Sequence, residues 1–323
     1  MKTDNTLAVL IISYRRSDGV RKLLDICKRN DISRIYLALD GPKNGSLVGK
    51  KVNFEIRQVI QDFTEKYPEV RVATLFRSKN LGCAASVLSA CDWAFESEEN
   101  LTILEDDCLP NDDFFTFSRC ALEVMRTRKD IWLSCGTQFA PNPLSKDSWC
   151  LSRYALTWGW ATTRENWIQI SSALKSVDKR SSFSDRSFVE RTYWLAGARR
   201  AFTGWVDVWD TILVQKMLAN QKFSILPDSP LITNIGNDEE ATHTRGASPW
   251  LYVHRGKFSD SGNTPVFAAE KDMWLFRAFF KISYRHLLST LLTRVKDSFN
   301  KSRKPFCPLL HRWEEAEYLR SRF

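Results

Sequence analysis

The sequence from 101 to 107 reads Leu101-Thr102-Ile103-Leu104-Glu105-Asp106-Asp107. Its first four residues are typical of a buried strand, and the three acids end that strand. Three adjacent carboxylates repel one another, so a half-buried set needs a cation or strong hydrogen-bond donors beside it. If the strand continued through the triplet, Glu105 and Asp107 would face one side and Asp106 the other. The triplet therefore predicts a site for a divalent metal and a diphosphate.

A simpler interpretation of the triplet is an acidic loop that caps the next helix. Asn111 or Asp112 could be the N-cap of that helix, and acidic residues favour a helix N-terminus. Both interpretations place carboxylates between a strand and a helix. The triplet alone does not decide between the two interpretations.

The chain before the triplet alternates between strand-like and helix-like segments. Strand-like apolar runs occur at 7–13, 35–39 and 70–76. Helical spacing of apolar residues follows at 20–28, 52–66 and 84–95. Such helices between strands imply parallel pairing and right-handed crossovers, which gather the carboxyl ends of the strands at one edge. We therefore predict an α/β fold with a mostly parallel, Rossmann-like central sheet flanked by helices.

Polar residues end each of these strands and should meet at the edge where such sheets bind ligands. Besides the triplet they include Ser13, Arg16, Asp40 and Arg77. A lone arginine is usually a solvated surface residue, but charged residues at successive strand ends favour a nucleotide site. The first strand is not followed by G-x-G-x-x-G or G-x-x-x-x-G-K-[ST], which weakens dinucleotide and P-loop interpretations.

Composition limits the partners and the compartment. The formal net charge of +9 over 323 residues favours anionic partners. Nucleic acid is not expected, because the charge is dispersed and no recognition motif accompanies it. Eight cysteines without a C-x-x-C pair or zinc spacing fit a reduced setting. No signal peptide or membrane span is apparent, so we expect a cytoplasmic protein.

Taken together, these motifs resemble those of glycosyltransferases with the GT-A fold, in particular the N-acetylglucosaminyltransferase I type and its bacterial relatives. The resemblance covers roughly residues 7 to 245, and the triplet followed by Asp113-Phe114-Phe115 is its most specific part. The other matching segments are Ile12-Ser13-Tyr14-Arg15-Arg16, Leu39-Asp40-Gly41, Arg77-Ser78-Lys79-Asn80-Leu81-Gly82, Trp158-Gly159-Trp160 and Val206-Asp207-Val208-Trp209.

The resemblance implies a role for each matching residue. Arg16 and Asp40 would hold the nucleotide. Asp107 would coordinate manganese or magnesium bridging the diphosphate, and Glu105 and Asp106 would contact the donor sugar and ribose. A hard cation with oxygen ligands suits that work, since the metal neutralises charge on the departing diphosphate.

Transfer to a hydroxyl also requires a base, and Asp207 is our candidate. Flanking Trp205 and Trp209 could desolvate its carboxylate and stack on sugar faces. In the family that the chain resembles, the matching aspartate deprotonates the acceptor in an inverting single displacement. Asp210, three residues on, is the rival. The structural alternative for Asp207 is a cap or first-turn acid of the following helix.

Two further segments yield predictions. The stretch Trp158-Gly159-Trp160 could form a wall of the sugar site, although tryptophan-rich segments more often belong to a core. His243 lies in an acidic, glycine-containing loop segment and is a second candidate metal or diphosphate ligand, by likeness to late histidines of some GT-A enzymes. The alternative for His243 is an ordinary exposed loop histidine.

After about Trp274 the chain becomes basic and amphipathic. This part could lie on an anionic membrane beside lipid-linked glycan acceptors, peripheral on the inner face of the cell membrane. It could equally pack on the catalytic domain with a solvated basic face. We divide the chain into a nucleotide-sugar-binding half (1–110), a metal- and acceptor-binding half of the same domain (111–270) and a basic C-terminal extension (271–323).

The expected function is metal-dependent, inverting transfer of a sugar from a nucleotide-diphosphate donor, such as a UDP-sugar, to a glycan hydroxyl in bacterial surface polysaccharide synthesis. A sugar nucleotidyltransferase is the enzymatic alternative, but it would need a glycine-rich loop after the first strand, where Ser13-Tyr14-Arg15-Arg16 stands. A non-catalytic carbohydrate- or nucleotide-binding module is the third hypothesis.

Overall fold

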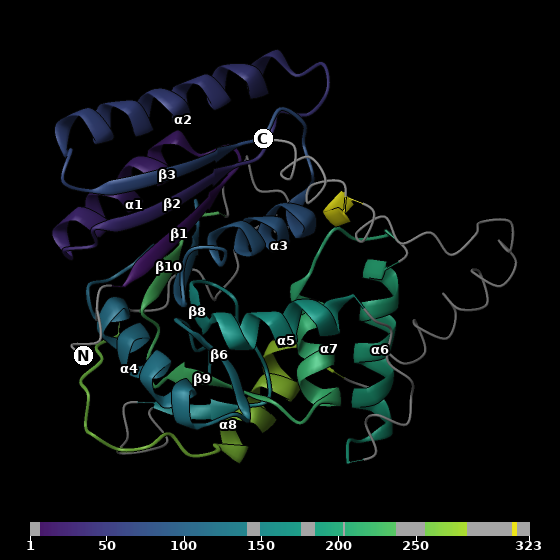
Figure 1. The fold of residues 1–323 in the computed structure, drawn as a ribbon. Coiled ribbons are helices and arrows are strands. Elements are labelled where there is room, and N and C mark those ends of the chain that lie inside the picture. Colours follow the sequence, from purple (N-terminus) through teal and green to yellow (C-terminus); the bar gives the residue numbers. More distant parts are fainter. Residues whose placement is uncertain are drawn as a thin grey trace, which may run out of the picture.

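The computed structural model describes residues 7–140, 149–175, 185–202, 204–236, 256–282 and 312–314. In this part of the chain, helices cover both faces of a central sheet of eight strands (Figure 1). The predicted α/β fold with a mostly parallel sheet is confirmed.

The first half of the sheet is parallel, as predicted. Its strands are β1 (Ala8–Ser13), β2 (Arg34–Leu39), β3 (Arg71–Phe76) and β4 (Asn100–Glu105). They are linked by α1 (Ser17–Arg29), α2 (Leu47–Lys66) and α3 (Cys83–Ala94). β1 pairs in parallel with both β2 and β4, so the carboxyl ends of these three strands lie side by side.

The second half is mixed. Its strands are β5 (Cys108–Pro110), β6 (Ile131–Cys135), β7 (Trp149–Ser152), β8 (Trp160–Thr163), β9 (Phe223–Pro227) and β10 (Ile232–Asn234). Its helices are α4 (Asp113–Thr127), α5 (Arg164–Leu174), α6 (Phe188–Phe202), α7 (Asp210–Ala219), α8 (Ala269–Trp274) and a π-helical turn, η2 (Leu275–Phe279).

The strand order in the large sheet is β3-β2-β1-β4-β8-β6-β9-β7. β8 enters antiparallel between β4 and β6, and β7 pairs antiparallel with β9. A separate two-stranded antiparallel sheet joins β10 to β5, directly after the acidic triplet. This small sheet places the segment after β10 beside the carboxyl end of β4.

The side chains of β1 alternate between the two faces of the sheet, and each face is covered by its own hydrophobic cluster. Leu10 and Ile12 pack into the cluster formed with α3, α5, α6 and α7. Val9 and Ile11 face the opposite cluster, formed with α1, α2 and α4. A strand buried on both faces needs apolar residues at every position, which the run 7–12 supplies.

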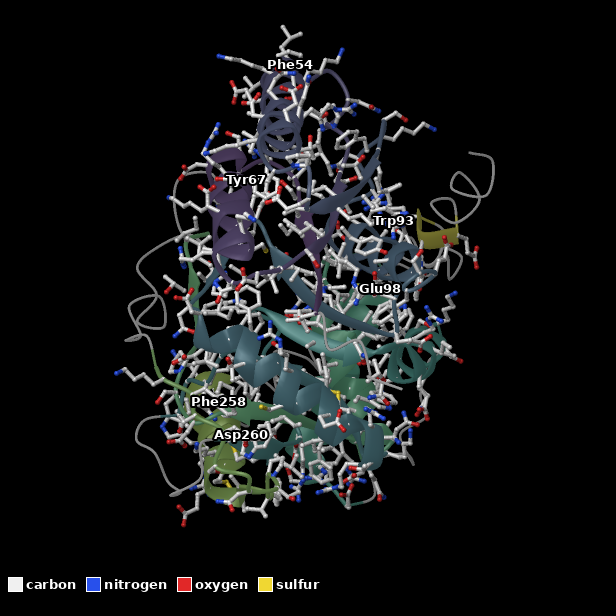
Figure 2. The ribbon with its side chains drawn as sticks, turned by 60° about the vertical axis from the view of Figure 1, so that its left-hand side comes forward. Phe54, Tyr67, Trp93, Glu98, Phe258 and Asp260 are labelled. Atoms are coloured by element: carbon white, nitrogen blue, oxygen red, sulfur yellow. The ribbon has the colours of Figure 1, made fainter. Side chains whose placement is uncertain are left out.

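The helix that follows the triplet is capped by its own loop. The Asn111 side chain accepts a hydrogen bond from the Phe114 backbone N–H at 3.1 Å, one of the two caps that the sequence suggested. Farther along the chain, Phe258 lies beside α4 (Figure 2). Its ring is 5.3 Å from that of Phe117, and its N–H donates to Asp113. This segment therefore closes the outer side of α4.

The start of the proposed C-terminal extension belongs to the core. Leu275 and Ile282 are buried, the Phe279 ring stacks on Phe139 at 4.5 Å, and Phe280 packs edge-on against Trp194. For residues 271–282 the packed alternative therefore holds, because these aromatic rings face protein. The basic residues beyond 282 fall outside the described residues. None of the helices in the described ranges is long and apolar enough to cross a membrane.

Asp272 on α8 provides a test of this packing. Its carboxylate accepts hydrogen bonds from the Ser152 hydroxyl and the Arg153 N–H, yet burial raises the pKa of Asp272 to about 6. A raised folded-state pKa means that the carboxyl group stabilises the fold most when protonated, and that this contribution is lost as pH rises to about 6. A pKa difference of about 2 corresponds to about 3 kcal/mol.

We expect the free energy of unfolding of the parent, relative to that of Asp272→Asn, to fall by up to about 3 kcal/mol between about pH 4 and pH 7. Urea unfolding of both proteins across this range measures the difference. A difference that stays constant with pH would contradict the buried placement of Asp272.

Candidate functional site

A cavity of about 800 Å³ opens at the carboxyl ends of β1, β2 and β4. It lies where a parallel sheet gathers its strand ends, as the sequence predicted. The predicted site residues that line it are Ser13, Arg16, Asp40, Glu105, Asp106, Asp107 and Asp207. One site therefore unites residues that are up to about 200 positions apart in the sequence.

Asp106 holds the loop between β1 and α1. One oxygen, Oδ2, accepts hydrogen bonds from the Ser13 hydroxyl and the Tyr14 N–H, both at 2.8 Å, and from the N–H groups of Arg15 and Arg16. Close packing supports the contact, since a Cβ on Gly19 would lie 1.9 Å from the Asp106 carbonyl oxygen. Asp106 thus shapes the loop that carries the predicted nucleotide contacts.

The strand ends within the triplet, so the side-chain alternation considered for Glu105, Asp106 and Asp107 does not apply. β4 ends at Glu105, and Asp106 and Asp107 form a turn before β5. The Asp106 N–H donates to the Ile12 carbonyl, which still ties the turn to β1. The turn, and not strand alternation, therefore directs the Asp106 side chain to the loop between β1 and α1.

Glu105 and Asp107 form the acidic floor of the cavity. Burial, together with the charges of Asp107, Asp106 and Asp210, raises the pKa of Glu105 to about 8. Burial, followed by the Asp106 charge, also raises the pKa of Asp107. The repulsion predicted from the sequence is therefore present, and a cation would relieve it.

The segment after β10 closes over Asp107. The Ile235 N–H donates to the Asp107 carbonyl at 2.8 Å, and a Cβ on Gly236 would lie 2.2 Å from Oδ2 of Asp107. Only a glycine at 236 allows the backbone this close to the carboxylate. The chain beyond, with the predicted ligand His243, lies outside the described residues.

The donor set suits a hard cation that shares its coordination with a substrate. Within the described ranges, no group of three or more His, Cys, Asp or Glu side chains is arranged to hold a metal ion. Mg²⁺ and similar cations are commonly bound through one or two carboxylates together with substrate phosphates. Asp107, with Glu105 on the same cavity floor, fits that arrangement, because burial and neighbouring carboxylates raise the pKa of both groups.

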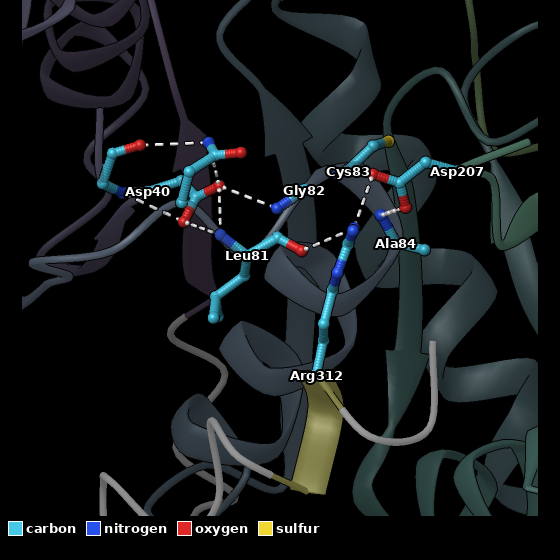
Figure 3. Close-up of polar contacts among 9 residues, drawn as sticks. Asp40, Leu81, Gly82, Cys83, Ala84, Asp207 and Arg312 are labelled. Atoms are coloured by element: carbon cyan, nitrogen blue, oxygen red, sulfur yellow. Dashed lines mark hydrogen bonds and ion pairs between the residues drawn. The ribbon is translucent and has the colours of Figure 1, made fainter. Parts of the chain in front are cut away.

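Asp40 is bound to the loop before α3 (Figure 3). Its carboxylate accepts from the N–H groups of Leu81 and Gly82 and from the Asn80 side chain at 2.9 Å. Burial nevertheless raises the pKa of Asp40 to about 6. Asp40 therefore lines the cavity, as predicted for a nucleotide contact, while most of its acceptor capacity serves this loop.

Asp207 caps α3, a helix distant from it in sequence. Its two oxygens accept the N–H groups of Cys83 and Ala84 at 2.9 and 3.2 Å (Figure 3). Gly82, with φ of 85°, makes room, because a Cβ there would lie 2.1 Å from Oδ2 of Asp207. The predicted structural alternative was a cap of the following helix. Asp210 instead begins that helix, α7, and also lines the cavity.

Arg77 is not among the residues that line the cavity. Its guanidinium donates to the side chains of Ser86 and Ser89 on α3, at 3.2 and 2.7 Å. These bonds fasten the end of β3 to α3, and the contact of Arg77 with the nucleotide stays a prediction.

The tryptophans divide between core and cavity. Trp160 is buried against Trp209, with ring centroids 5.3 Å apart, and belongs to the core. Trp158 is half-buried and lines the cavity, as expected of a sugar-site wall. Trp205 is 64% exposed, so it does not enclose Asp207 in the manner that the sequence suggested.

Several lining residues escaped the sequence analysis. Lys43, Phe279 and Arg312 line the cavity beside the predicted residues. Lys43 follows the Gly41-Pro42 turn after β2, which is a usable signal. Arg312 had no local signal, because only the folded chain brings it to the site.

Comparisons with known proteins give no family. No protein-family profile matches the chain, and no curated protein matches it. Among solved structures, it is similar to the mannosyltransferase PcManGT from Pyrobaculum calidifontis, in complex with GDP-Man and Mn²⁺. That likeness has 15% identity, a TM-score of 0.39 and coverage of 66% of this chain and 69% of the other.

Two other solved structures show a similar partial likeness. A UDP-glucose pyrophosphorylase with UDP-glucose gives 7% identity, a TM-score of 0.36 and coverage of 68% and 90%. The inositol-1-phosphate CTP transferase from T. maritima gives 11% identity, a TM-score of 0.36 and coverage of 69% and 85%. Scores this low carry no argument about function. None of the three is an N-acetylglucosaminyltransferase I, so that closer resemblance stays a prediction.

The four donors on Asp106 predict a stability effect. Asp106→Ala should lower the free energy of unfolding by about 2 to 3 kcal/mol, since three part-buried N–H groups and a hydroxyl lose a charged acceptor. Asp106→Asn keeps one acceptor oxygen and should lose less. Urea denaturation measures both.

The matched control is Asp18→Ala on α1, whose carboxylate is 71% exposed and pairs with Lys22. It should change stability by less than about 0.5 kcal/mol. An Asp106→Ala protein as stable as this control would show that the loop does not depend on Asp106.

Proposed function

We propose that the chain is a metal-dependent glycosyltransferase that moves a sugar from a nucleotide-diphosphate donor to a glycan hydroxyl with inversion. The observation that carries the proposal is the acidic floor of Glu105 and Asp107 in a cavity bordered by cations. Arg15, Arg16 and Lys43 line the same cavity at the ends of β1 and β2. A cavity with carboxylates for a cation and cationic side chains for phosphates suits a metal–diphosphate pair.

Asp107 and Glu105 would hold Mn²⁺ or Mg²⁺, in keeping with their raised pKa values and oxygen donors. A bound cation would supply Lewis acidity toward the leaving diphosphate. The N–H groups of residues 14 to 16 already donate to Asp106. Recognition of the phosphates would therefore fall to side chains such as Arg16 and Lys43.

Two aspartates that line the cavity, Asp207 and Asp210, are candidates for the base that deprotonates the sugar acceptor. In a single displacement, the base takes the hydroxyl proton as the acceptor oxygen bonds to the anomeric carbon and the bond to the diphosphate oxygen breaks. Asp207 is our proposed base, because its backbone donors fix it at the cavity edge. Asp210 is the alternative, because it is exposed on the first turn of α7 and lines the same cavity.

The other enzymatic hypothesis makes a different product. A sugar nucleotidyltransferase joins a nucleotide to a sugar phosphate and releases pyrophosphate, whereas a glycosyltransferase releases a nucleoside diphosphate. The short loop 13–16, held by Asp106, offers no glycine-rich phosphate cradle. A binding module would retain the nucleotide sugar without releasing either product.

The metal role predicts a ligand-dependent gain in stability. MnCl₂ with UDP-glucose, UDP-N-acetylglucosamine or GDP-mannose should raise the melting temperature for the donor that fits. At 100 times its Kd, a ligand stabilises the fold by about 2.7 kcal/mol. Asp107→Ala should lose the manganese-dependent part of this shift, and Asp18→Ala should keep it. An unchanged shift in Asp107→Ala, or in the parent with chelator, would refute the metal role.

The base assignment predicts unequal effects of two isosteric changes. Asp207→Asn should lower kcat for nucleoside diphosphate release by about 100-fold or more, since general base catalysis contributes about that much. Asp210→Asn should have a smaller effect. Chromatography of released nucleotide measures both. The reverse order would assign the base to Asp210, and a product of retained anomeric configuration would exclude the single displacement.

A further inference from the structure

A short segment near the end of the sequence, residues 312–314, docks beside α3 (Figure 1). We call it the C-terminal latch. Its Trp313 is only 1% exposed, and the indole N–H donates to Oδ2 of Asp92 at 2.5 Å. The other Asp92 oxygen accepts the indole N–H of Trp167 at 2.8 Å. Lys175 lies over the Trp313 ring, 4.4 Å from its centroid.

These contacts make Trp313 an anchor. A buried indole contributes large apolar area, and its N–H is satisfied by a carboxylate on α3. Asp92 joins the latch to α5 as well, because the same carboxylate accepts from Trp167. The latch is therefore fixed to two helices of the main core.

The anchor brings Arg312 to the cavity. One guanidinium nitrogen lies 3.4 Å from the Leu81 carbonyl oxygen and 3.7 Å from Oδ2 of Asp207 (Figure 3). The side chain is 49% exposed and lines the cavity. Arg312 thus contacts both the loop before α3 and the carboxylate that caps α3.

We propose that the C-terminal latch completes the active site, with Trp313 as its anchor and Arg312 as a positioning residue for Asp207. The catalytic part of this proposal rests on the proposed function, in which Asp207 is the base. Two backbone N–H groups hold the Asp207 carboxylate from the side of α3, and Arg312 holds Oδ2 from the side of Leu81. The third contact fixes the orientation of a carboxylate that is itself 38% exposed.

Arg312 has a matched control in its own segment. Glu314 belongs to the same helical turn, is exposed, and is not among the residues that line the cavity. Glu314→Ala therefore disturbs the latch surface without touching Asp207. Arg312→Lys keeps the positive charge but replaces the planar guanidinium with a compact ammonium group.

The first experiment tests the contact and requires no turnover. Amide hydrogen exchange of the full chain, followed on peptides that cover residues 81–94, compares the parent with Arg312→Ala and Glu314→Ala. We expect exchange at Cys83 and Ala84 to rise up to about fivefold in Arg312→Ala, as the loss of a partly exposed ion pair allows. Exchange equal to that of Glu314→Ala would overturn the proposal.

The second experiment tests the positioning of Asp207. With UDP-glucose or GDP-mannose and MnCl₂, Arg312→Ala should lower kcat for nucleoside diphosphate release about 10- to 100-fold, the cost of a misplaced catalytic group. The donor KM should stay constant, and Arg312→Lys should restore part of kcat. A loss shared by Glu314→Ala, or a change confined to KM, would overturn the positioning role.

A third variant separates anchor from positioning residue. Trp313→Phe keeps an apolar ring but lacks the N–H that binds Asp92, so it should show the exchange and kcat changes of Arg312→Ala in weaker form. Parent-like behaviour would remove Trp313 as the anchor. If the parent releases no nucleoside diphosphate from either donor, the proposed function fails, while the exchange experiment still decides whether the latch holds Asp207.

Discussion

Repulsion among adjacent carboxylates at the end of β4 is the constraint on which the site depends. A turn relieves part of this repulsion, because it directs the Asp106 carboxylate to the hydrogen-bond donors of the loop 13–16. Glu105 and Asp107 are left on the cavity floor, where burial and neighbouring negative charge raise their pKa values. The same geometry therefore organises one loop and leaves an acidic site that favours a cation.

Carboxylates serve throughout the site as acceptors for backbone N–H groups. Asp106 holds the loop after β1, Asp40 holds the loop before α3, and Asp207 caps α3 itself. Each of these bonds joins segments that are distant in sequence. The rim of the cavity is thus built from charged hydrogen bonds between distant segments, which are stronger than bonds between neutral groups.

Sequence periodicity was sufficient to predict the parallel half of the sheet, because β1 to β4 are short apolar runs separated by well-patterned helices. The convergence of Ser13, Arg16, Asp40 and the triplet follows from that topology. The sequence did not indicate which groups the side chains of the site would contact. Arg77 binds α3 and Asp207 caps a helix more than 100 residues before it, and no local pattern encodes either contact. The approach of Arg312 depends on the tertiary fold in the same way.

The π-helical turn η2 has a consequence for how the chain can be divided. It brings Phe279 to the cavity while the ring stacks on Phe139, and the neighbouring Lys271 is buried in a pair with Asp228. A recombinant fragment that stopped at residue 270 would lack a wall of its own pocket and would leave Asp228 without its cation. Shortened versions of this protein should therefore keep this turn as well as the C-terminal latch.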